Sequence, residues 1–500
     1  MTGLPTPKLS FTRAGTVCLC LLAGLLGLLV WRYAAHTGAL LAYPYDWDED
    51  EGYHVYFAKC LLQGQTIYGD INQVPMLPQT YPPVHAAVLS LFVSGLGATL
   101  FAGRLLSMLA VVGIAGVVLA AVRQETGRWS LGALAAALVV GSPYFTVWGP
   151  LCRVDSLMVF FVLSGLLLLR QYPRSRAALV AGLLLLLLAC YTKQQAVVLL
   201  PTGFLHLWRS NRRTALLSLA GFAGAGLAAL LGLQLWSGGY FWPNVVTAQT
   251  TEFRFELVIA RLKDFLPLHG LLVAGATGWL VYQIRARRLN FWSVFALNSA
   301  VFVILAGKNG AELNYYLAPV VAVTICSVLA LDRVWRSLPA HWAAGTVAEV
   351  MILLLVLQGL IFWFYPFRAP TAADVQAGDK LLALVRNCSG DPLIERRAMF
   401  SVLAGRKPQA DFCLLFFLHE QDLAREEAAS SHGSYRPRWE PSALVQAIRE
   451  KRFPLIIMEP KVVPDEVVSA VSTNYQTLMK QPISIGTWWG ANTYQIGVPR

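Results

Sequence analysis

Charged residues are scarce in this chain. Asp, Glu, Lys and Arg make up 14% of its 500 residues, hydrophobic residues make up 56%, and the mean hydropathy is +0.53. A soluble domain carries roughly 25% charged residues. The composition therefore excludes an ordinary soluble protein and predicts that most of the chain lies in lipid.

Cysteines with the spacing of a metal site are missing, as are internal repeats and low-complexity tracts. Most of the 8 cysteines are scattered, several of them inside apolar runs, where a thiol packs as a small hydrophobic group. Cys388 and Cys413 lie in a more polar part of the chain and are the one candidate pair for an external disulfide.

Acidic residues are outnumbered by basic ones, 28 against 40. In a soluble protein this excess would suggest a nucleic-acid partner, but here the basic residues form short clusters between apolar runs, which is typical of cytoplasmic loops. The expected partner is therefore membrane lipid and not nucleic acid. The first apolar run, residues 14–30, lacks a convincing signal-peptide cleavage site, so residues 1–8 are expected to stay in the cytoplasm.

The basic clusters also predict the number of membrane crossings, because an even number must separate any two cytoplasmic loops. The count predicts an α-helical polytopic membrane protein with about 11 transmembrane helices and its amino terminus inside. The expected crossings are residues 14–30, 105–122, 131–148, 156–169, two between 176 and 209, 215–236, 266–284, 291–306, 315–331 and 342–364. The apolar run 84–100 is left over and is expected to be an interfacial or re-entrant helix in the first external loop, residues 34–100.

The composition changes near residue 366, where charged residues and prolines replace the apolar runs. Residues 1–365 are therefore expected to form the transmembrane module, and residues 366–500 a small C-terminal α/β external domain. Periodicity predicts helices at 374–386 and 465–478 and strands at 454–458 and 493–498. A segment of this length can hold a core of its own.

Four polar groups converge on the outer face in this topology. They are the acidic cluster Asp46-Trp47-Asp48-Glu49-Asp50-Glu51, the segment Arg153-Val154-Asp155-Ser156, the pair Lys193-Gln194, and the segment from Lys308 to Tyr315. A charge at membrane depth costs about 2.5–3.5 kcal/mol on insertion scales, so such residues are candidates for function. After the acidic cluster, apolar residues recur at helical spacing up to Gly64, which predicts a helix lying on the membrane surface.

The first external loop resembles that of integral-membrane glycosyltransferases of the C superfamily. The matching segments are Asp50-Glu51-Gly52, Leu61-Leu62-Gln63-Gly64-Gln65-Thr66-Ile67-Tyr68 and Tyr81-Pro82-Pro83-Val84. Arg153-Val154-Asp155-Ser156 is similar to the Leu-Asp-Ser segment of protein O-mannosyltransferases, and Thr192-Lys193 resembles the Thr-Lys pair of aminoarabinose transferases. The pattern is most similar to bacterial members of these two groups and covers most of residues 10–330. The aminoarabinose enzymes carry a Glu-Lys pair where this chain has Gln79-Thr80, so no role is carried over from that glutamate.

The resemblance implies an inverting glycosyltransferase that moves a sugar from a polyprenyl-phosphate-linked donor to an acceptor. The transfer would occur on the outer face of the cytoplasmic membrane of a prokaryote, with the C-terminal domain outside. The acceptor stays open among protein, lipid and glycan, and the sugar and any metal requirement stay open too.

The chemistry of such a transfer explains the candidate residues. An attacking hydroxyl must lose its proton, which calls for a carboxylate base. Asp50 is the candidate because it stands at the family's first-acid position, and Glu51 and Asp155 are further catalytic candidates. A departing phosphate gathers negative charge, which calls for cations, and Arg153 and Lys193 are the candidates. Further candidate substrate contacts are Tyr81, Gln194, Lys308, Asn314 and Tyr315.

Plain structural explanations compete with each of these roles. Asp50 is one of five acids that solvent can cover, Arg153 and Asp155 can simply pair, and Lys193 can extend from a helix end. Asn314 and Tyr315 are suited to capping and anchoring the next helix. Asp155 has three open roles: orienting Arg153, binding the acceptor, or holding a divalent ion. For the whole chain, the alternatives are a secondary transporter, which predicts inverted repeats that the sequence does not show, and a non-catalytic membrane assembly protein.

Overall fold

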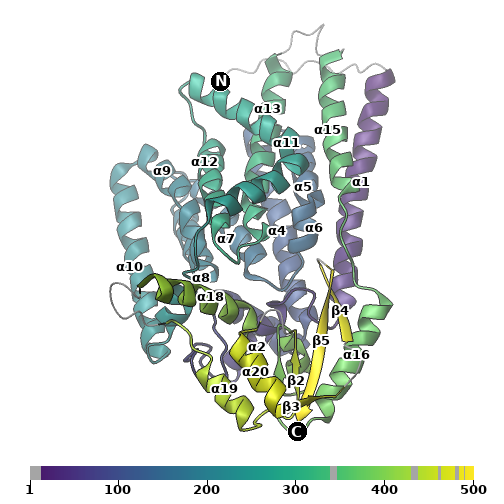
Figure 1. Ribbon diagram of the computed structural model, residues 1–500. Helices are drawn as coiled ribbons and strands as arrows, with labels where there is room; N and C mark the ends of the chain where they lie inside the picture. The colour runs from purple at the N-terminus through teal and green to yellow at the C-terminus, as the bar shows by residue number, and fades with distance from the viewer. Residues whose placement is uncertain (1–12, 338–345, 430–436, 460–462, 479–482, 489) are drawn as a thin grey trace.

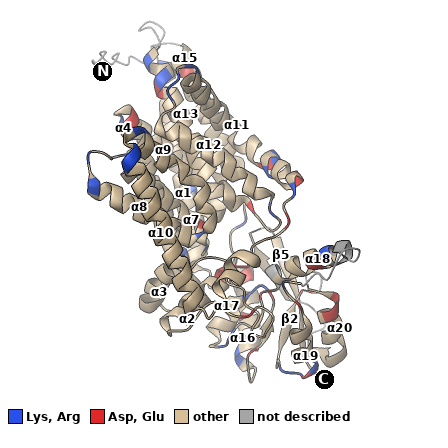
Figure 2. Ribbon diagram, turned by 90° about the vertical axis from the view of Figure 1, so that its left-hand side faces the viewer, with Lys and Arg blue, Asp and Glu red and all other residues tan. Residues whose placement is uncertain are grey.

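A bundle of apolar helices forms one end of the molecule and a mixed sheet with its own helices forms the other (Figure 1). The computed structural model describes all residues except 1–12, 338–345, 430–436, 460–462, 479–482 and 489. The described chain begins at the far end of the bundle, and the carboxyl terminus lies in the sheet part. Lys and Arg gather at the bundle end where the chain begins (Figure 2).

Five helices among the described residues are long and apolar enough to cross a membrane. They are α1 (Arg13–Ala42), α4 (Leu100–Thr126), α10 (Arg212–Trp236), α13 (Leu317–Ser337) and α15 (Thr346–Phe364). Shorter apolar helices are α3 (Val84–Leu96), α5 (Trp129–Gly141), α7 (Val154–Leu169), α8 (Arg176–Thr192) and α12 (Phe291–Ile304). The long helix α11 (Phe255–Arg285) packs against α13, and α1 packs against α15.

The predicted count of 11 crossings is not confirmed. Residues 131–148 are divided between α5 and α6 (Pro143–Trp148), because Ser142 leaves the helical conformation and Pro143 has no N–H to continue the hydrogen-bond ladder. Residues 176–209 contain α8, the 3-10 helix η1 (Gln194–Leu199) and α9 (Pro201–Ser210). At about 1.5 Å per residue, the 10 residues of α9 reach only part of the way across a bilayer.

The apolar run 84–100, which was expected to be one interfacial or re-entrant helix, is divided between two helices. Helix α3 ends at Leu96 because Gly97 adopts a φ of 80°, and Thr99 then caps α4 by accepting a hydrogen bond from the N–H of Ala102. The helix predicted after the acidic cluster is found as α2 (Glu51–Leu62), which ends just before Gly64 at a φ of 69°. Its place on the membrane surface stays a prediction.

Residues after α15 form helices and a five-stranded sheet. The helices are α16 (Ala372–Asn387), α17 (Ala398–Leu403), α18 (Phe412–Ala429), α19 (Ser442–Arg449) and α20 (Asp465–Asn474). The strands are β1 (Leu393–Ile394), β2 (Ile456–Met458), β3 (Tyr475–Thr477), β4 (Ile483–Thr487) and β5 (Gly490–Pro499). Strand β2 lies between β1, to which it is parallel, and β5, to which it is antiparallel; β5 also pairs with β3 and β4.

Two sequence predictions for this part need correction. The helix expected at 465–478 ends at Asn474, because residues 475–477 pair with β5 as strand β3. Cys388 has a free thiol, which donates to the carbonyl of Val385, and the side chain of Cys413 lies outside the described residues. The structure therefore gives no support to the disulfide.

The two parts of the molecule meet where α17 packs on α2. A β-carbon on Gly52 would lie 2.4 Å from the backbone nitrogen of Met399, so only glycine permits this approach. Asp46 accepts hydrogen bonds from the N–H groups of Gly52 (2.7 Å) and Met399 (3.1 Å). The acidic cluster is thus fastened to the sheet part as well as to the bundle.

Candidate active site

Glu51 lies on the buried side of the first turn of α2. Its carboxylate accepts hydrogen bonds from the backbone N–H groups of Trp47 (2.9 Å), Asp48 (3.1 Å) and Cys152 (2.9 Å). Arg104 of α4 donates to both carboxylate oxygens, at 2.8 and 2.6 Å, and both side chains are fully buried. Burial alone would raise the pKa of Glu51, but the adjacent Arg104 and these hydrogen bonds lower it below its ordinary value. Glu51 is therefore an ionised carboxylate with all of its bonds directed inward.

Arg104 fastens three segments together through this ion pair. Its remaining N–H groups donate to the backbone carbonyls of Leu40 (2.5 Å), Tyr43 (2.6 Å) and Tyr45 (2.9 Å). The end of α1, the start of α2 and helix α4 are thereby held in one arrangement. We did not select Arg104 from the sequence, although a lone arginine inside the apolar run that starts at Leu100 was the signal for it.

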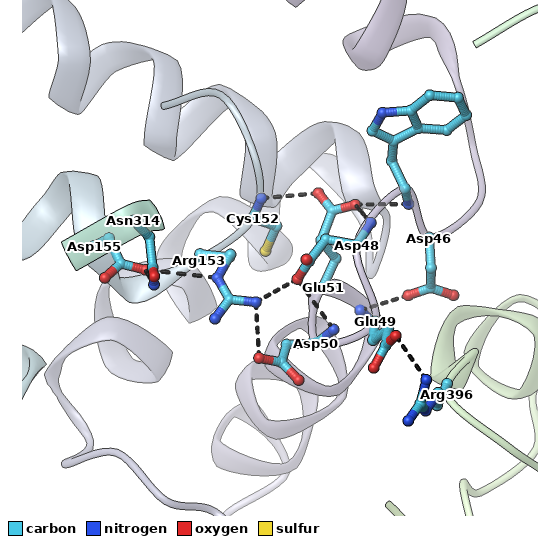
Figure 3. A network of polar contacts seen from close by, with 12 residues as sticks. Asp46, Asp48, Glu49, Asp50, Glu51, Cys152, Arg153, Asp155, Asn314 and Arg396 are labelled. Atoms are coloured by element: carbon cyan, nitrogen blue, oxygen red, sulfur yellow. Dashed lines mark hydrogen bonds and ion pairs between the residues drawn. The ribbon is translucent and has the colours of Figure 1, made fainter. Parts of the chain in front are cut away.

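Asp50 lies on the open side of the same turn. It stands at the N-cap of α2, and its side chain makes no capping hydrogen bond. Its carboxylate is 2.8 Å from Arg153 Nη1, and 31% of its side chain is exposed. Figure 3 shows the guanidinium of Arg153 between Asp48 and Asp50 on one side and Asp155 on the other. Arg153 therefore holds Asp50 in place while leaving part of that carboxylate accessible.

Asp155 and Lys193 form a buried ion pair behind Arg153. Lys193 Nζ lies 2.6 Å from Asp155, whose other oxygen accepts a hydrogen bond from Asn314 (2.9 Å). The ammonium also lies 4.2 Å from the ring centre of Tyr315 and 5.7 Å from that of Tyr81, which is favourable cation–π geometry. This pair links the start of α7, the end of α8 and the 3-10 helix η4 (Leu313–Tyr316).

Two clefts meet at Asp50 and Arg153. The first has a volume of about 100 Å³ and is bounded by α2, the turn around Tyr81 and the loop from Lys308 to Ala311. The second has a volume of about 490 Å³ and lies between this region and the sheet part of the chain. Asp50 and Arg153 line both clefts. Groups bound in the two clefts would therefore both lie next to this pair.

The structure divides the predicted residues into two sets. Those that line the first cleft are Asp50, Tyr81, Arg153, Lys308, Asn314 and Tyr315. Those behind its wall are Glu51, Asp155, Lys193 and Gln194. The amide of Gln194 donates to the carbonyls of Thr80 (3.2 Å) and Val245 (3.0 Å), which ties the loop before Tyr81 to the π-helix Pro243–Thr247.

Asn314 was considered above as a cap of the following helix. It does not have that role. Its amide donates to Asp155 from within η4. Arg153 contacts Asp48 and Asp50 more closely than Asp155, which lies 3.6 Å away, so it does not simply pair with its sequence neighbour.

Lys308 is the cation in the loop that closes the first cleft. Burial, and next the positive charge of Lys193, lowers the pKa of Lys308 to about 7. Its ammonium donates to Gln249, another residue of the cleft wall. Lys308 can therefore change its charge near neutral pH.

Further residues at the site were not selected from the sequence. Asp48 is the buried partner of Arg153, and Arg396 from the sheet part lies 3.0 Å from Glu49. Arg396 had no visible signal, because its place depends on the docking of α17 on α2. Among the described residues, no group of three or more His, Cys, Asp or Glu side chains is placed to hold a metal ion.

A family model described as dolichyl-phosphate-mannose-protein mannosyltransferase matches residues 80–236. No curated protein sequence matches the chain. The structure is similar to that of ArnT from Cupriavidus metallidurans bound to undecaprenyl phosphate, with a TM-score of 0.57, 14% identity, and coverage of 97% of this chain and 98% of that one. It is also similar to the Archaeoglobus fulgidus oligosaccharyltransferase in complex with Zn and sulfate, with a TM-score of 0.53, 12% identity, and coverage of 94% and 72%. The resemblance seen in the first external loop is thereby confirmed at the level of the fold.

Proposed function

Since the chain has the fold of the integral-membrane glycosyltransferases of the C superfamily, we propose that it transfers a sugar from a polyprenyl-phosphate-linked donor to an acceptor hydroxyl. The family match over residues 80–236 and the fold together support transferase activity. The solved ArnT structure contains undecaprenyl phosphate, which favours a lipid-phosphate donor here too.

One observation carries the proposal: a partly exposed carboxylate stands where two clefts meet. Asp50 is held by Arg153 at 2.8 Å and lines both clefts. A transferase must bring two substrates together at a base, and a junction of two clefts provides that geometry.

The reaction is a single displacement. The acceptor oxygen attacks the anomeric carbon of the donor sugar, and its proton passes to the carboxylate of Asp50. The bond between the anomeric carbon and the phosphate oxygen breaks, and its electron pair leaves with the polyprenyl phosphate. Attack from the side opposite the leaving phosphate inverts the anomeric configuration.

Arg153 and Lys308 are the cations that line the first cleft. We assign the donor phosphate to them, because a preorganised cation stabilises the charge that grows on the leaving group. Lys193 was expected to bind this phosphate directly, but it is 1% exposed and paired with Asp155. Its proposed role is to position Asp155, which in turn lies beside Arg153.

Glu51 is likewise proposed as a positioning residue and not as a catalytic one. Its carboxylate accepts five hydrogen-bond contacts from buried donors, and none of them comes from a cleft. It fixes the first turn of α2 and thereby the place of Asp50.

We place the transfer on the outer face of the cytoplasmic membrane of a prokaryote, with residues 366–500 outside. The support is the gathering of Lys and Arg at the opposite end of the bundle, since basic loops stay in the cytoplasm (Figure 2).

The test uses the purified full chain with short-chain polyprenyl-phosphate sugars and, separately, with nucleotide sugars. The expected result is release of polyprenyl phosphate and a product with inverted anomeric configuration from the lipid-linked donor alone. Transfer from the nucleotide sugar alone would overturn the proposal, because nucleotide donors belong to the cytoplasmic side. Retention of configuration would overturn the single displacement.

A further inference from the structure

The second cleft has aromatic groups from both parts of the molecule. Trp488, in the turn between β4 and β5, packs edge-on against Trp148 of α6 with ring centres 4.8 Å apart. Phe417 of α18 lines the same cleft, and both Trp488 and Phe417 are half-buried. The sheet part thus presents two partly open aromatic rings to the place where Asp50 stands.

A buried hydrogen-bond donor lies in the wall of this cleft. Trp148 is 2% exposed, and its indole N–H has no partner among the described residues. An unsatisfied buried donor costs about 1–3 kcal/mol. A ligand oxygen in the cleft would remove this cost.

Charges around the second cleft are nearly balanced and already paired. Four carboxylates face three guanidinium groups in its lining. Arg261 lies 3.0 Å from Glu312, Arg396 lies 3.0 Å from Glu49, and Arg153 lies 2.8 Å from Asp50. An anionic headgroup would meet a slight excess of negative charge here, in contrast to a phosphate site, which needs surplus cations.

Paired side chains still have hydrogen-bonding capacity. A guanidinium has five N–H donors and a carboxylate about four acceptor positions, so each ion pair can also bind neutral hydroxyl groups. Arg396 adopts a φ of 56°, a left-handed conformation that is strained for arginine. Such strain is concentrated at functional sites, and here it occurs at the residue that reaches Glu49.

Peptide binding by strand addition has no template in this cleft. None of the described residues that line it belongs to a β-strand, so no free strand edge can pair with an extended chain.

We infer that the second cleft binds the acceptor and that this acceptor is an uncharged glycan. The inference rests on the proposed transfer reaction for the direction of chemistry, but the binding site stands on its own contacts. The apolar C–H face of a sugar ring packs on Trp488 or Phe417, since the face of an aromatic ring carries negative charge density. Sugar hydroxyls bond to the three ion pairs and to the indole N–H of Trp148, and one hydroxyl points toward Asp50. The cavity volume of about 490 Å³ lies within the range of small-molecule sites, about 300–1,000 Å³.

The test measures equilibrium binding by calorimetry without any donor. The full chain is titrated with short neutral oligosaccharides of mannose, glucose and N-acetylglucosamine, with a serine-containing peptide, and with anionic phospholipid. We expect an oligosaccharide to bind and Trp488→Ala to weaken that binding about tenfold through the lost ring contact. Trp488→Phe keeps an aromatic ring and should retain most of the affinity. This variant shows that the loss in Trp488→Ala comes from the missing ring and not from misfolding. Trp242→Ala, an exposed tryptophan elsewhere, is the matched control and should bind as the parent does.

Transfer assays with the same panel separate this inference from the proposed function. Oligosaccharide binding that depends on Trp488, without any sugar transfer, would leave the glycan site standing and overturn the transferase. Sugar transfer to the peptide or the phospholipid, with no oligosaccharide bound, would support the transferase and overturn the glycan site. Oligosaccharide binding that is equally strong in Trp488→Ala and Trp488→Phe as in the parent would overturn the placement in the second cleft.

Discussion

Two neighbouring carboxylates at the start of α2 have opposite surroundings. Glu51 points into the bundle, is fully buried, and is bonded to Arg104 and three backbone N–H groups. Asp50 points toward the clefts, is partly exposed, and is held by Arg153. Consecutive side chains in a helix point about 100° apart. Neighbouring carboxylates can therefore differ, with one buried in a structural role and the next accessible to a substrate. Residue type therefore marks the region, and burial decides which acid can meet a substrate.

Substitution of the buried carboxylate, Glu51, should have the largest effect on stability and turnover. Glu51→Gln leaves the guanidinium of Arg104 buried without its counter-charge, and breaking a buried pair costs about 3–5 kcal/mol. We expect a marked loss of thermal stability, measured by unfolding in detergent, together with loss of turnover. Glu125→Gln, which breaks the partly exposed pair with Arg170, is the matched control and should cost about 1 kcal/mol or less. Equal stability of the two variants would contradict the structural role of Glu51.

Substitution of the accessible carboxylate, Asp50, should lower activity without lowering stability. Asp50→Asn preserves shape and removes basicity, so turnover should fall at least about 100-fold, while the unfolding temperature should stay near that of the parent. The measurement is product formation from a lipid-linked sugar, with exposed Asp465→Asn as the control. An Asp50→Asn protein with the parent rate would move the base to another acid of the cluster.

The pair behind the cleft should have an intermediate effect. Lys193→Ala leaves Asp155 buried without its cation and frees it to pull Arg153 away from Asp50. We expect turnover and donor affinity to fall together, by at least about tenfold, because truncating one partner of a buried charge pair costs several kcal/mol. Lys193→Arg should recover part of the loss, since guanidinium differs in shape and reach. The exposed Lys380→Ala is the control, and a full rescue of Lys193→Ala by raised donor concentration alone would contradict the positioning role.

The smallest effect should be a pH dependence at Lys308. The ammonium form predominates below a pKa of about 7 and is lost above it, so the KM for the donor should rise severalfold as the pH increases past 7. Lys308→Arg stays charged throughout this range and should have a flatter profile. The measurement is the donor KM at a series of pH values, and an unchanged slope in Lys308→Arg would remove Lys308 from the phosphate site.

The sequence was a good guide to residue types and a poor guide to their partners. Scarce charges in an apolar chain identified Asp50, Arg153, Asp155 and Lys193 as a set, and the structure brings them together. Periodicity could not say that Lys193 lies behind the wall and Lys308 in it, because both follow apolar helices in the same way.

The number of membrane-crossing helices was also hard to predict from the sequence. Mean hydropathy does not register the break at Ser142 and Pro143, since the residues on both sides of it stay apolar. Arg396 and Trp488 reach the site only through the folding of the sheet part onto α2, a contact between residues more than 300 positions apart. No local pattern contains that information.

The most direct test of the account is a density map of the full chain with polyprenyl phosphate bound. We expect the phosphate in the first cleft, within hydrogen-bond reach of Arg153 and Lys308, with Asp50 beside it and the second cleft free for the acceptor. A phosphate in the second cleft, or a lipid bound only in the apolar groove lined by Leu26, Leu134 and Leu331, would contradict it.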